Sequence, residues 1–317
     1  RPRAVRSFLR EFLSDRRVVE THPLLWRPVL EGIILRVRPR ASAAKYATVW
    51  RPGEETSRSG SPLMHYSERQ GELLQQELGE SVQVRIAMRY GQPALRCVMG
   101  ELMEAGCRRI ALLPLYPQYA ASSAGTVVDE AARFILASRN QPELRTVRSF
   151  ETAPAYIEAL ATALEQHWRV HGRPDPAAGE RLLLSFHSIP QAMHDAGDPY
   201  RAECERTVEL LSQRLNLSDR LAQLTFQSVF GPAAWIGPAT IDAVGELGRA
   251  GCPRLDVICP GFVSDCLETL EEINQLNRET FTTAGGGSFH YIPWGNDSDG
   301  AIATVAEQAR NVLAGWI

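Results

Sequence analysis

The chain has 317 residues and a formal net charge of -3, with 44% hydrophobic and 22% charged residues. This length and apolar content suit about two globular domains with sizeable cores. The small net charge argues against a nucleic-acid partner, which a strongly basic surface would bind. No apolar run reaches about 18 residues and no signal peptide is recognisable, so no membrane-spanning segment is expected.

The six cysteines are scattered along the chain without a C-x-x-C pair. This usage is typical of reduced, buried thiols and therefore predicts a cytoplasmic protein. We expect neither the cysteines nor the histidines to form a structural zinc site.

The N-terminal part of the chain predicts helices followed by a loop. Apolar residues recur at helical spacing over 4–13 and over 24–37, where Pro28 and Gly32 predict a break. Residues 51–62 are rich in Gly, Pro and Ser and predict a polar loop.

The rest of the chain alternates short apolar runs with longer helical stretches. In the first half we expect strands at 82–90, 108–116 and 144–150, and helices at 94–105 and 127–138. In the second half we expect strands at 181–190, 221–230 and 254–260, and helices at 201–215, 239–251, 264–277 and 301–315. This alternation is typical of parallel sheets covered by helices on both faces, the doubly wound α/β class.

A weak internal repeat predicts two similar halves. Residues 104–119 resemble residues 249–264, because each stretch has Gly-Cys at a helix end, then a strand and a proline turn. Pro and Gly collect over 151–180, where we expect a linker. The second half has a strand, ending at His187, before its first helix, whereas the first half begins with a helix. We therefore expect that a strand has been lost before residue 1.

The sequence has no nucleotide-binding glycine fingerprint, neither G-x-G-x-x-G nor a P-loop. In doubly wound folds, ligands bind at the carboxyl ends of the strands, so the residues at those ends matter most. His187 in SFHSIP (185–190) ends an apolar strand, where an imidazole can act as a base or as a metal ligand. From position alone, a histidine that is merely hydrogen-bonded at a strand end is an equally open interpretation.

A second polar group follows the strand at 254–260. Asp265, Glu268 and Glu272 in PGFVSDCLETLEE (260–272) lie at related turns of a predicted helix, with the last two on one face. Carboxylates stacked in this way repel one another unless protons or a cation occupy the site. The alternative is a solvated acidic helix start, which the helix dipole favours.

Two aromatic stretches could form the walls of a site for a flat ligand. Tyr116 and Tyr119 stand among prolines in LLPLYPQY (112–119), and Phe230 and Trp235 lie in FQSVFGPAAWIGP (226–238). Ordinary packing of loops and core explains each stretch equally well when it is taken alone.

Taken together and in this order, the motifs resemble those of the ferrochelatase family across essentially the whole chain. The matching stretches are EFLSDRRVV (11–19), SPLMHYSERQ (61–70), Arg89–Tyr90, LPLYPQY (113–119), SFHSIP (185–190), GDPY (197–200), FQSVFGPAAWIGP (226–238) and PGFVSDCLETLEEI (260–273).

The resemblance implies two Rossmann-like domains with parallel sheets and a porphyrin cleft between them. The first domain would comprise residues 1–151 with 295–317, and the second residues 152–294. His187 and Glu268 match the catalytic pair that faces the centre of the macrocycle and handles the metal, and Glu272 would extend a proton relay. The matches to porphyrin-binding positions are Tyr46, Ser61, Arg89, Tyr116, Trp235, Phe262 and Asp265.

The resemblance also implies the reaction, in which Fe²⁺ is inserted into protoporphyrin IX to form haem b. Fe²⁺ is then a substrate, and no permanently bound cofactor is expected. The [2Fe-2S] cluster of some members is not expected, because Ala121 stands where they have a cysteine and the C-terminal stretch has none. Residues 51–60 form a longer insertion before Ser61 than the family usually shows. Whether His187 or Glu268 takes the pyrrole protons stays open.

Residues 22–38 match the lip of the cleft and combine apolar side chains with arginines. They could touch a membrane surface, which predicts a cytoplasmic protein that is peripheral at the inner membrane, or they could simply pack on their own domain. Two further alternatives are a chelatase for coproporphyrin or for another metal, and a tetrapyrrole-binding protein without catalysis.

Overall fold

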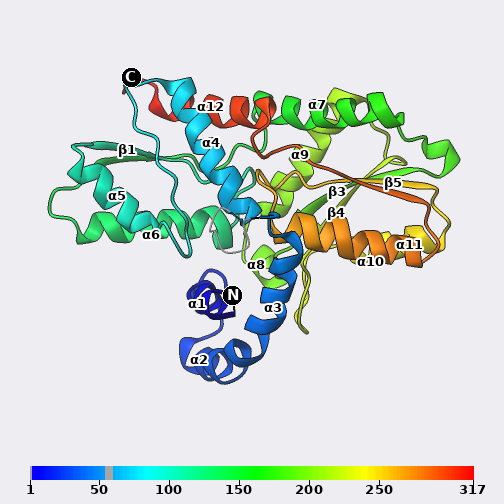
Figure 1. The fold of residues 1–317 in the computed structure, drawn as a ribbon, viewed down its shortest axis with the longest axis horizontal. Coiled ribbons are helices and arrows are strands. Elements are labelled where there is room, and N and C mark those ends of the chain that lie inside the picture. The colour runs from blue at the N-terminus through cyan, green and yellow to red at the C-terminus, as the bar shows by residue number, and fades with distance from the viewer. Residues whose placement is uncertain (1, 54–59) are drawn as a thin grey trace.

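The computed structural model describes residues 2–53 and 60–317 of the chain. It contains two separate parallel sheets (Figure 1). The smaller sheet pairs β1 (Arg109–Leu112) with β2 (Glu143–Thr146). The larger has the order β4-β3-β5-β6, with strands Ala222–Gln227, Arg181–His187, Arg254–Ile258 and Ser288–Ile292. The predicted α/β class with parallel sheets is therefore confirmed.

Helices cover both faces of the larger sheet because its strands are apolar on both sides. Leu182, Leu184 and Phe186 of β3 pack in one core with α7 (Pro154–His171) and α9 (Tyr200–Leu215). Leu183 points the other way, into a core formed with α10 (Thr240–Arg249), α11 (Arg278–Thr283) and the π-helix η4 (Glu268–Asn277). This pattern leaves the carboxyl ends of the strands free to carry polar groups.

The smaller sheet packs against α5 (Leu95–Glu104) and α6 (Thr126–Ala137), which lie beside it in Figure 1. The remaining short elements are the π-helix η2 (Ala121–Gly125), the 3₁₀ turn η3 (Pro176–Ala178) and α8 (Gln191–Asp195).

The N-terminal helices form a lip below both sheets (Figure 1). The lip consists of α1 (Pro2–Leu13), α2 (Pro23–Val29), η1 (Leu30–Ile34) and α3 (Leu35–Val49). The predicted break over 24–37 is confirmed, because Pro28 lies inside α2 and a π-helical turn follows it. Proline has no backbone N–H to give to the helix, which explains the local change of hydrogen-bonding pattern. None of the described helices is both long enough and apolar enough to cross a membrane.

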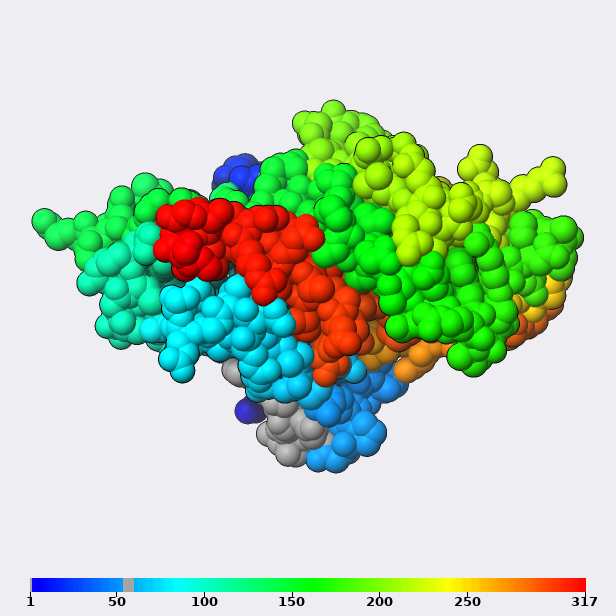
Figure 2. Space-filling model, turned by 90° about the horizontal axis from the view of Figure 1, so that it is seen from above, coloured from blue at the N-terminus to red at the C-terminus, as the bar shows by residue number. Residues whose placement is uncertain are grey.

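The last helix, α12 (Asp299–Leu313), lies on top of the molecule beside α7 and next to α4 (Pro62–Leu78), as Figure 2 shows. Arg310 of α12 pairs with Glu77 of α4 at 2.7 Å, and Glu307 accepts a hydrogen bond from the backbone N of Ala155 at the start of α7. The C-terminal helix therefore joins elements from the two halves of the chain.

The internal repeat corresponds to a repeated piece of structure. Gly106 after α5 and Gly251 after α10 both have positive φ, of 94° and 71°. The next residue, Cys107 or Cys252, donates its backbone N–H to a carbonyl oxygen of the preceding helix, that of Leu102 or Leu247. Each of these two turns is a helix C-cap that favours glycine, and each is followed by a parallel strand.

Two expectations about local structure are wrong. Residues 82–90 form no strand, only an isolated bridge between Met88 and Ala94, because they make no ladder of backbone hydrogen bonds with any strand in the described part of the chain. Most of the linker expected over 151–180 is the helix α7. Its Pro154 stands at the first helical turn and Gly172 just after the end, so these residues delimit a helix rather than build a loop.

Candidate active site

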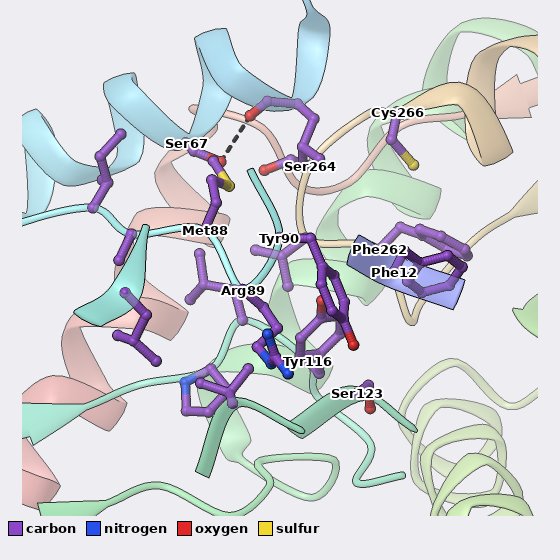
Figure 3. A pocket seen from close by; sticks show the side chains of 18 of the residues that line it. Phe12, Ser67, Met88, Arg89, Tyr90, Tyr116, Ser123, Phe262, Ser264 and Cys266 are labelled. Carbon is purple, nitrogen blue, oxygen red and sulfur yellow. Dashed lines mark hydrogen bonds between the residues drawn. The ribbon is translucent and has the colours of Figure 1, made fainter. Parts of the chain in front are cut away.

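A cavity of about 2500 Å³ lies between the lip and the carboxyl ends of the strands. Figure 3 shows Arg89, Tyr90 and Tyr116 grouped on one side of it, and Phe262 and Cys266 toward another. All the predicted site residues except Asp265 line this cavity, namely Tyr46, Ser61, Arg89, Tyr116, His187, Trp235, Phe262, Glu268 and Glu272. The fold therefore brings together side chains that are far apart in the sequence.

His187 is the last residue of β3, where the strand opens into the cavity. Its ring atom Nδ1 lies 2.6 Å from the carbonyl oxygen of Ser188. Because a carbonyl can only accept, Nδ1 carries the hydrogen, and in the neutral ring Nε2 keeps its lone pair. Nε2 can therefore accept a proton or bind a metal ion. The ring of Phe262 stands beside the imidazole, with 6.5 Å between centroids.

Gln227 connects the histidine to the acidic helix. It is the register partner of His187 on β4, and its buried amide nitrogen donates to the backbone oxygen of Glu268 at 2.8 Å. Its amide oxygen accepts from the hydroxyl of Ser185. The sequence analysis missed this residue, although it lies in FQSVF at the end of a predicted strand. Gln227 holds the start of η4 against the end of β3.

Two tyrosines and a cysteine surround the carboxylate of Glu268. Burial, followed by the negative charge of Glu268, raises the pKa of both Tyr46 and Tyr116. Burial also raises the pKa of Cys266 well above its usual range, and Glu268 adds to this shift. Both phenols and the thiol are therefore neutral near pH 7, which leaves the phenols as hydrogen-bond donors toward the cavity. Cys266 was not among the predicted site residues.

Glu272 lies one turn further along η4 and is held by Ser228, the residue that follows β4. The backbone N and the Oγ of Ser228 each donate to one carboxylate oxygen of Glu272, both at 2.6 Å. The neighbouring Glu271 forms an ion pair with Lys45 of α3 at 2.8 Å. The helix η4 thus presents Glu268, Glu271 and Glu272 to the cavity, with two of the three engaged.

Asp265 lies behind the cavity wall. Its carboxylate accepts hydrogen bonds from Tyr291 at 2.5 Å, from Thr269 at 2.7 Å and from Asn296 at 2.7 Å. Its backbone N donates to the side chain of Asn296. These bonds anchor the loop that leads into η4, so Asp265 fixes the position of the acidic helix. Its predicted contact with porphyrin stays a prediction.

Arg89 lines the cavity, but most of its guanidinium group is occupied by contacts with other residues of the protein. Its guanidinium donates to Asp15 and to the carbonyl oxygen of Thr126, and it lies 4.4 Å from the centre of the Tyr90 ring. The side chains of Arg89 and Asp15 are only 10% and 7% exposed. This buried pair joins the segment that follows α1 to the segment that precedes α5.

Another part of the cavity lining is aromatic. Trp235 donates its indole N–H to the carbonyl oxygen of Phe230 at 2.9 Å, and the two rings lie 4.7 Å apart. Arg38 of α3 lies over the Phe230 ring at 5.1 Å. Ser61 lines the cavity just before α4, and residues 54–59 of the insertion that precedes it lie outside the described part of the chain. Aromatic rings and a few polar groups in the lining of one cavity suit a planar, largely apolar ligand.

Comparison with known families decides which ligand this is. The family model described as ferrochelatase matches residues 1–313. The chain belongs to the ferrochelatase family. It is thus a porphyrin metal chelatase, an enzyme of haem biosynthesis.

Curated ferrochelatases resemble the chain over nearly its full length. The ferrochelatase of Dechloromonas aromatica is 48% identical over 316 residues, which is 99% of this chain and 84% of that protein. The ferrochelatase of Chromobacterium violaceum is 47% identical with the same coverage. Among solved structures, SirB from Bacillus subtilis with Fe³⁺ has a TM-score of 0.57 at 14% identity and covers 81% of this chain and 93% of that one. The likeness to SirB concerns the fold, and it supports a chelatase-like arrangement of the ferrochelatase sheets.

Proposed function

We propose that this ferrochelatase inserts Fe²⁺ into protoporphyrin IX to form haem b, the terminal step of haem biosynthesis. One observation carries the proposal. His187 and Glu268, which are 81 positions apart in the numbering, line one cavity and are coupled through Gln227. An imidazole whose Nε2 has no partner among the described residues, and a carboxylate in the same cavity, are the groups that metal insertion needs.

The reaction requires that two pyrrole protons leave the macrocycle as Fe²⁺ enters it. In our proposal His187 accepts the protons one at a time at Nε2 and releases each before it takes the next, and Glu268 binds the incoming metal or passes protons outward. Glu272 continues the relay along η4 toward Ser228. Fe²⁺ is a substrate here, and we propose neither a permanently bound cofactor nor a [2Fe-2S] cluster.

The remaining residues would bind and orient the porphyrin. Tyr116, Trp235 and Phe262 supply the aromatic walls of the cavity. Tyr46 and Ser61 offer hydroxyl groups from the lip side. Arg89 and Asp265 would act mainly by holding the segments that carry these groups. A cavity wall that binds a distorted macrocycle more tightly than a flat one would use binding energy to lower the barrier to metal entry.

The lip would receive the porphyrin from a membrane surface. Leu24 and Leu25 of α2 are 77% and 70% exposed, and Ile33 is 58% exposed. Arginines such as Arg27 and Arg36 stand among them, so the surface combines apolar side chains with positive charge. Such a surface suits docking on anionic lipid headgroups. We therefore propose a cytoplasmic enzyme that is peripheral at the inner membrane.

The experiment that tests the function follows the loss of protoporphyrin fluorescence with Fe²⁺ under anaerobic conditions. We expect turnover by the wild type, and loss of turnover with retained porphyrin binding in His187→Ala and in Glu268→Gln. Parallel assays with Co²⁺, Ni²⁺ and coproporphyrin compare the alternative substrates. Turnover at wild-type rates in both variants, or a clear preference for another metal or porphyrin, would contradict the proposal.

A further inference from the structure

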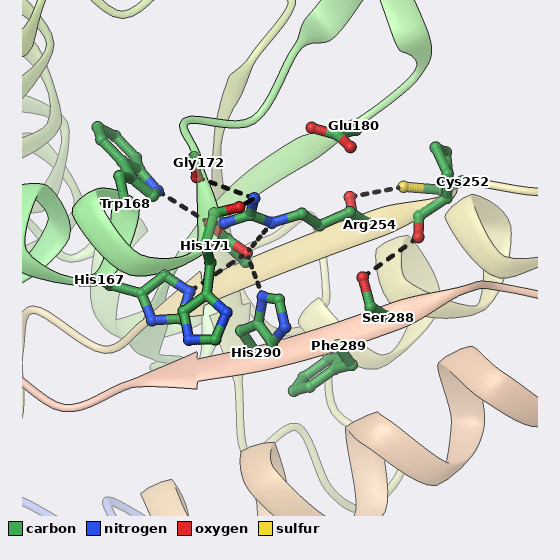
Figure 4. A network of polar contacts seen from close by, with 12 residues as sticks. His167, Trp168, His171, Gly172, Glu180, Cys252, Arg254, Ser288, Phe289 and His290 are labelled. Atoms are coloured by element: carbon green, nitrogen blue, oxygen red, sulfur yellow. Dashed lines mark hydrogen bonds and ion pairs between the residues drawn. The ribbon is translucent and has the colours of Figure 1, made fainter.

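A second group of metal-ligating side chains lies between α7, β5 and β6 (Figure 4). His167 and His171 are four residues apart on α7, and their rings stack with centroids 4.4 Å apart. Asp256 of β5 and His290 of β6 are register partners on adjacent strands and therefore point to the same face of the sheet. The three imidazoles and the carboxylate converge at one place.

The distances within this group approach those of a coordination sphere. His290 Nδ1 lies 3.0 Å and His167 Nε2 lies 3.9 Å from Oδ1 of Asp256. One ligand atom from each of the three residues lies within 4.8 Å of the others. A tetrahedral ion with bonds of about 2.0 to 2.1 Å holds its ligand atoms about 3.3 Å apart. Small side-chain adjustments therefore bring the three atoms to bonding positions.

The carboxylate is oriented by groups that suit a second coordination shell. Asp256 is 0% exposed and accepts hydrogen bonds from Nε and Nη2 of Arg254 and from the indole N–H of Trp168. Arg254 is itself fixed by the carbonyl oxygens of His171 and Gly172. Such outer contacts fix the direction of a metal-binding carboxylate.

One ring nitrogen in this group has a free valence for a metal. Nε2 of His167 is shielded from solvent and has no hydrogen-bond partner among the described residues. Buried polar atoms normally have partners, so the unpaired nitrogen points to a missing ligand.

We propose that His167, His290 and Asp256 bind a divalent transition-metal ion of the Zn²⁺ type. Imidazole-rich sites with one carboxylate select such ions rather than Mg²⁺ or Ca²⁺. None of these residues, nor His171, lines the cavity that holds His187, so this site is separate from the substrate metal path. A bound ion would join α7 to β5 and β6 and stabilise this half of the chain. The sequence analysis expected no structural zinc and overlooked the spacing of His167 and His171.

The test uses the full chain with His187→Ala and Glu268→Gln, so that the substrate centre no longer contributes metal ligands. Equilibrium dialysis with Zn²⁺ and the visible d–d absorption of Co²⁺ measure the stoichiometry and the affinity. We expect one bound ion per chain and a rise in Tm with Zn²⁺. Adding His167→Gln or His290→Gln should weaken binding at least about 10-fold, because losing a direct ligand costs no less than losing an outer one. His22→Gln, at the exposed start of α2, is the matched control and should leave binding unchanged.

Two results would overturn the proposal, namely no stoichiometric binding in the parent protein, or unchanged binding after either cluster substitution. Circular dichroism checks that the cluster variants are folded. If they are not, X-ray absorption at the zinc edge of the parent protein decides the question. Scattering from two or more imidazoles supports the site, and a shell without histidine rejects it.

Discussion

Ser228 clamps the carboxylate of Glu272 with two hydrogen bonds of 2.6 Å, one from its backbone N and one from its Oγ. Ser228 has a φ of 65°, a left-handed conformation that non-glycine residues seldom adopt. The turn after β4 is thus shaped so that both donors point at η4. The far end of the proposed relay has a fixed position, whereas the carboxylate of Glu268 faces the cavity.

Glu272→Gln should lower kcat about tenfold or more and leave the KM for porphyrin nearly unchanged. The substitution keeps the size of the side chain but removes a group that can carry a proton, and positioned acids and bases typically contribute about 10² to 10⁴ in rate. Steady-state kinetics in H₂O and D₂O measure the effect. Glu279→Gln, on the exposed side of α11, is the control and should behave like the wild type. Equal kcat values for the two variants would argue against a relay through Glu272.

Asp15→Asn should lower the free energy of unfolding by about 3 kcal/mol or more, because it leaves Arg89 buried without its counter-charge. Urea denaturation measures the change. The control is Asp129→Asn, which breaks the pair of Asp129 with Arg17 at 2.5 Å, where the side chains are 30% and 42% exposed. We expect a loss of at most about 1 kcal/mol there. Similar losses in both variants would contradict the difference in burial.

Stability should depend on pH through Glu203 of α9. Burial raises the pKa of this carboxyl group above its ordinary value of 4.5, although Tyr119 and Arg148 donate hydrogen bonds to it. A raised pKa means that the folded protein holds the proton more tightly than the unfolded chain does. The contribution is therefore fully present below pH 4.5 and is lost as the pH rises through the pKa of the folded state.

The free energy of unfolding of the wild type, measured relative to Glu203→Gln, should accordingly increase as the pH falls from about 7 toward 4.5. Urea titrations at several pH values measure it. Glu158→Gln provides a comparison of opposite sign, because the hydrogen bond from Arg214 lowers the pKa of Glu158. Its benefit is present above pH 4.5 and disappears at lower pH. If the stability difference between the wild type and Glu203→Gln changes with pH in the same direction as that between the wild type and Glu158→Gln, the opposite pKa shifts of the two glutamates are refuted.

Replacing Leu24 and Leu25 together by Ser should reduce co-sedimentation with anionic vesicles about tenfold or more. Each leucine that enters an apolar phase contributes up to about 1.5 to 3 kcal/mol, so two partly inserted side chains account for this factor. Leu136→Ser is the control, because Leu136 is 82% exposed but lies on α6, outside the lip. If both variants bind vesicles as the wild type does, the lip is not the docking surface.

The sequence alone predicts the α/β class and the position of the central histidine. The strand that ends at His187 was predictable because its apolar run, residues 182–186, is interrupted only by Ser185 and stops at His187, three residues before Pro190. The helix over 264–277 was predicted as well, but it begins later and is π-helical over Glu268–Asn277. The pattern of side chains does not predict such a change, because the choice between α- and π-helical hydrogen bonds depends on how neighbouring segments pack against the helix.

Other features could not be predicted from the sequence, because they depend on contacts between distant segments. The extended residues 82–90 have the composition of a strand, but a strand also needs a partner. Gln227 and Ser228 act through Glu268 and Glu272, which lie more than 40 residues away and belong to another element. The sequence pattern shows which face of an element is apolar. It does not show that the buried side-chain amide of Gln227 donates to η4.

The position of α12 has a consequence for product release. This helix contacts α4 on one side and α7 on the other, so it links the two halves of the chain. The two halves cannot swing far apart without breaking it. The product of the proposed reaction should therefore leave on the other side, where α3 contacts η4 with an ion pair between Lys45 and Glu271. Its exit would then require that this exposed contact opens.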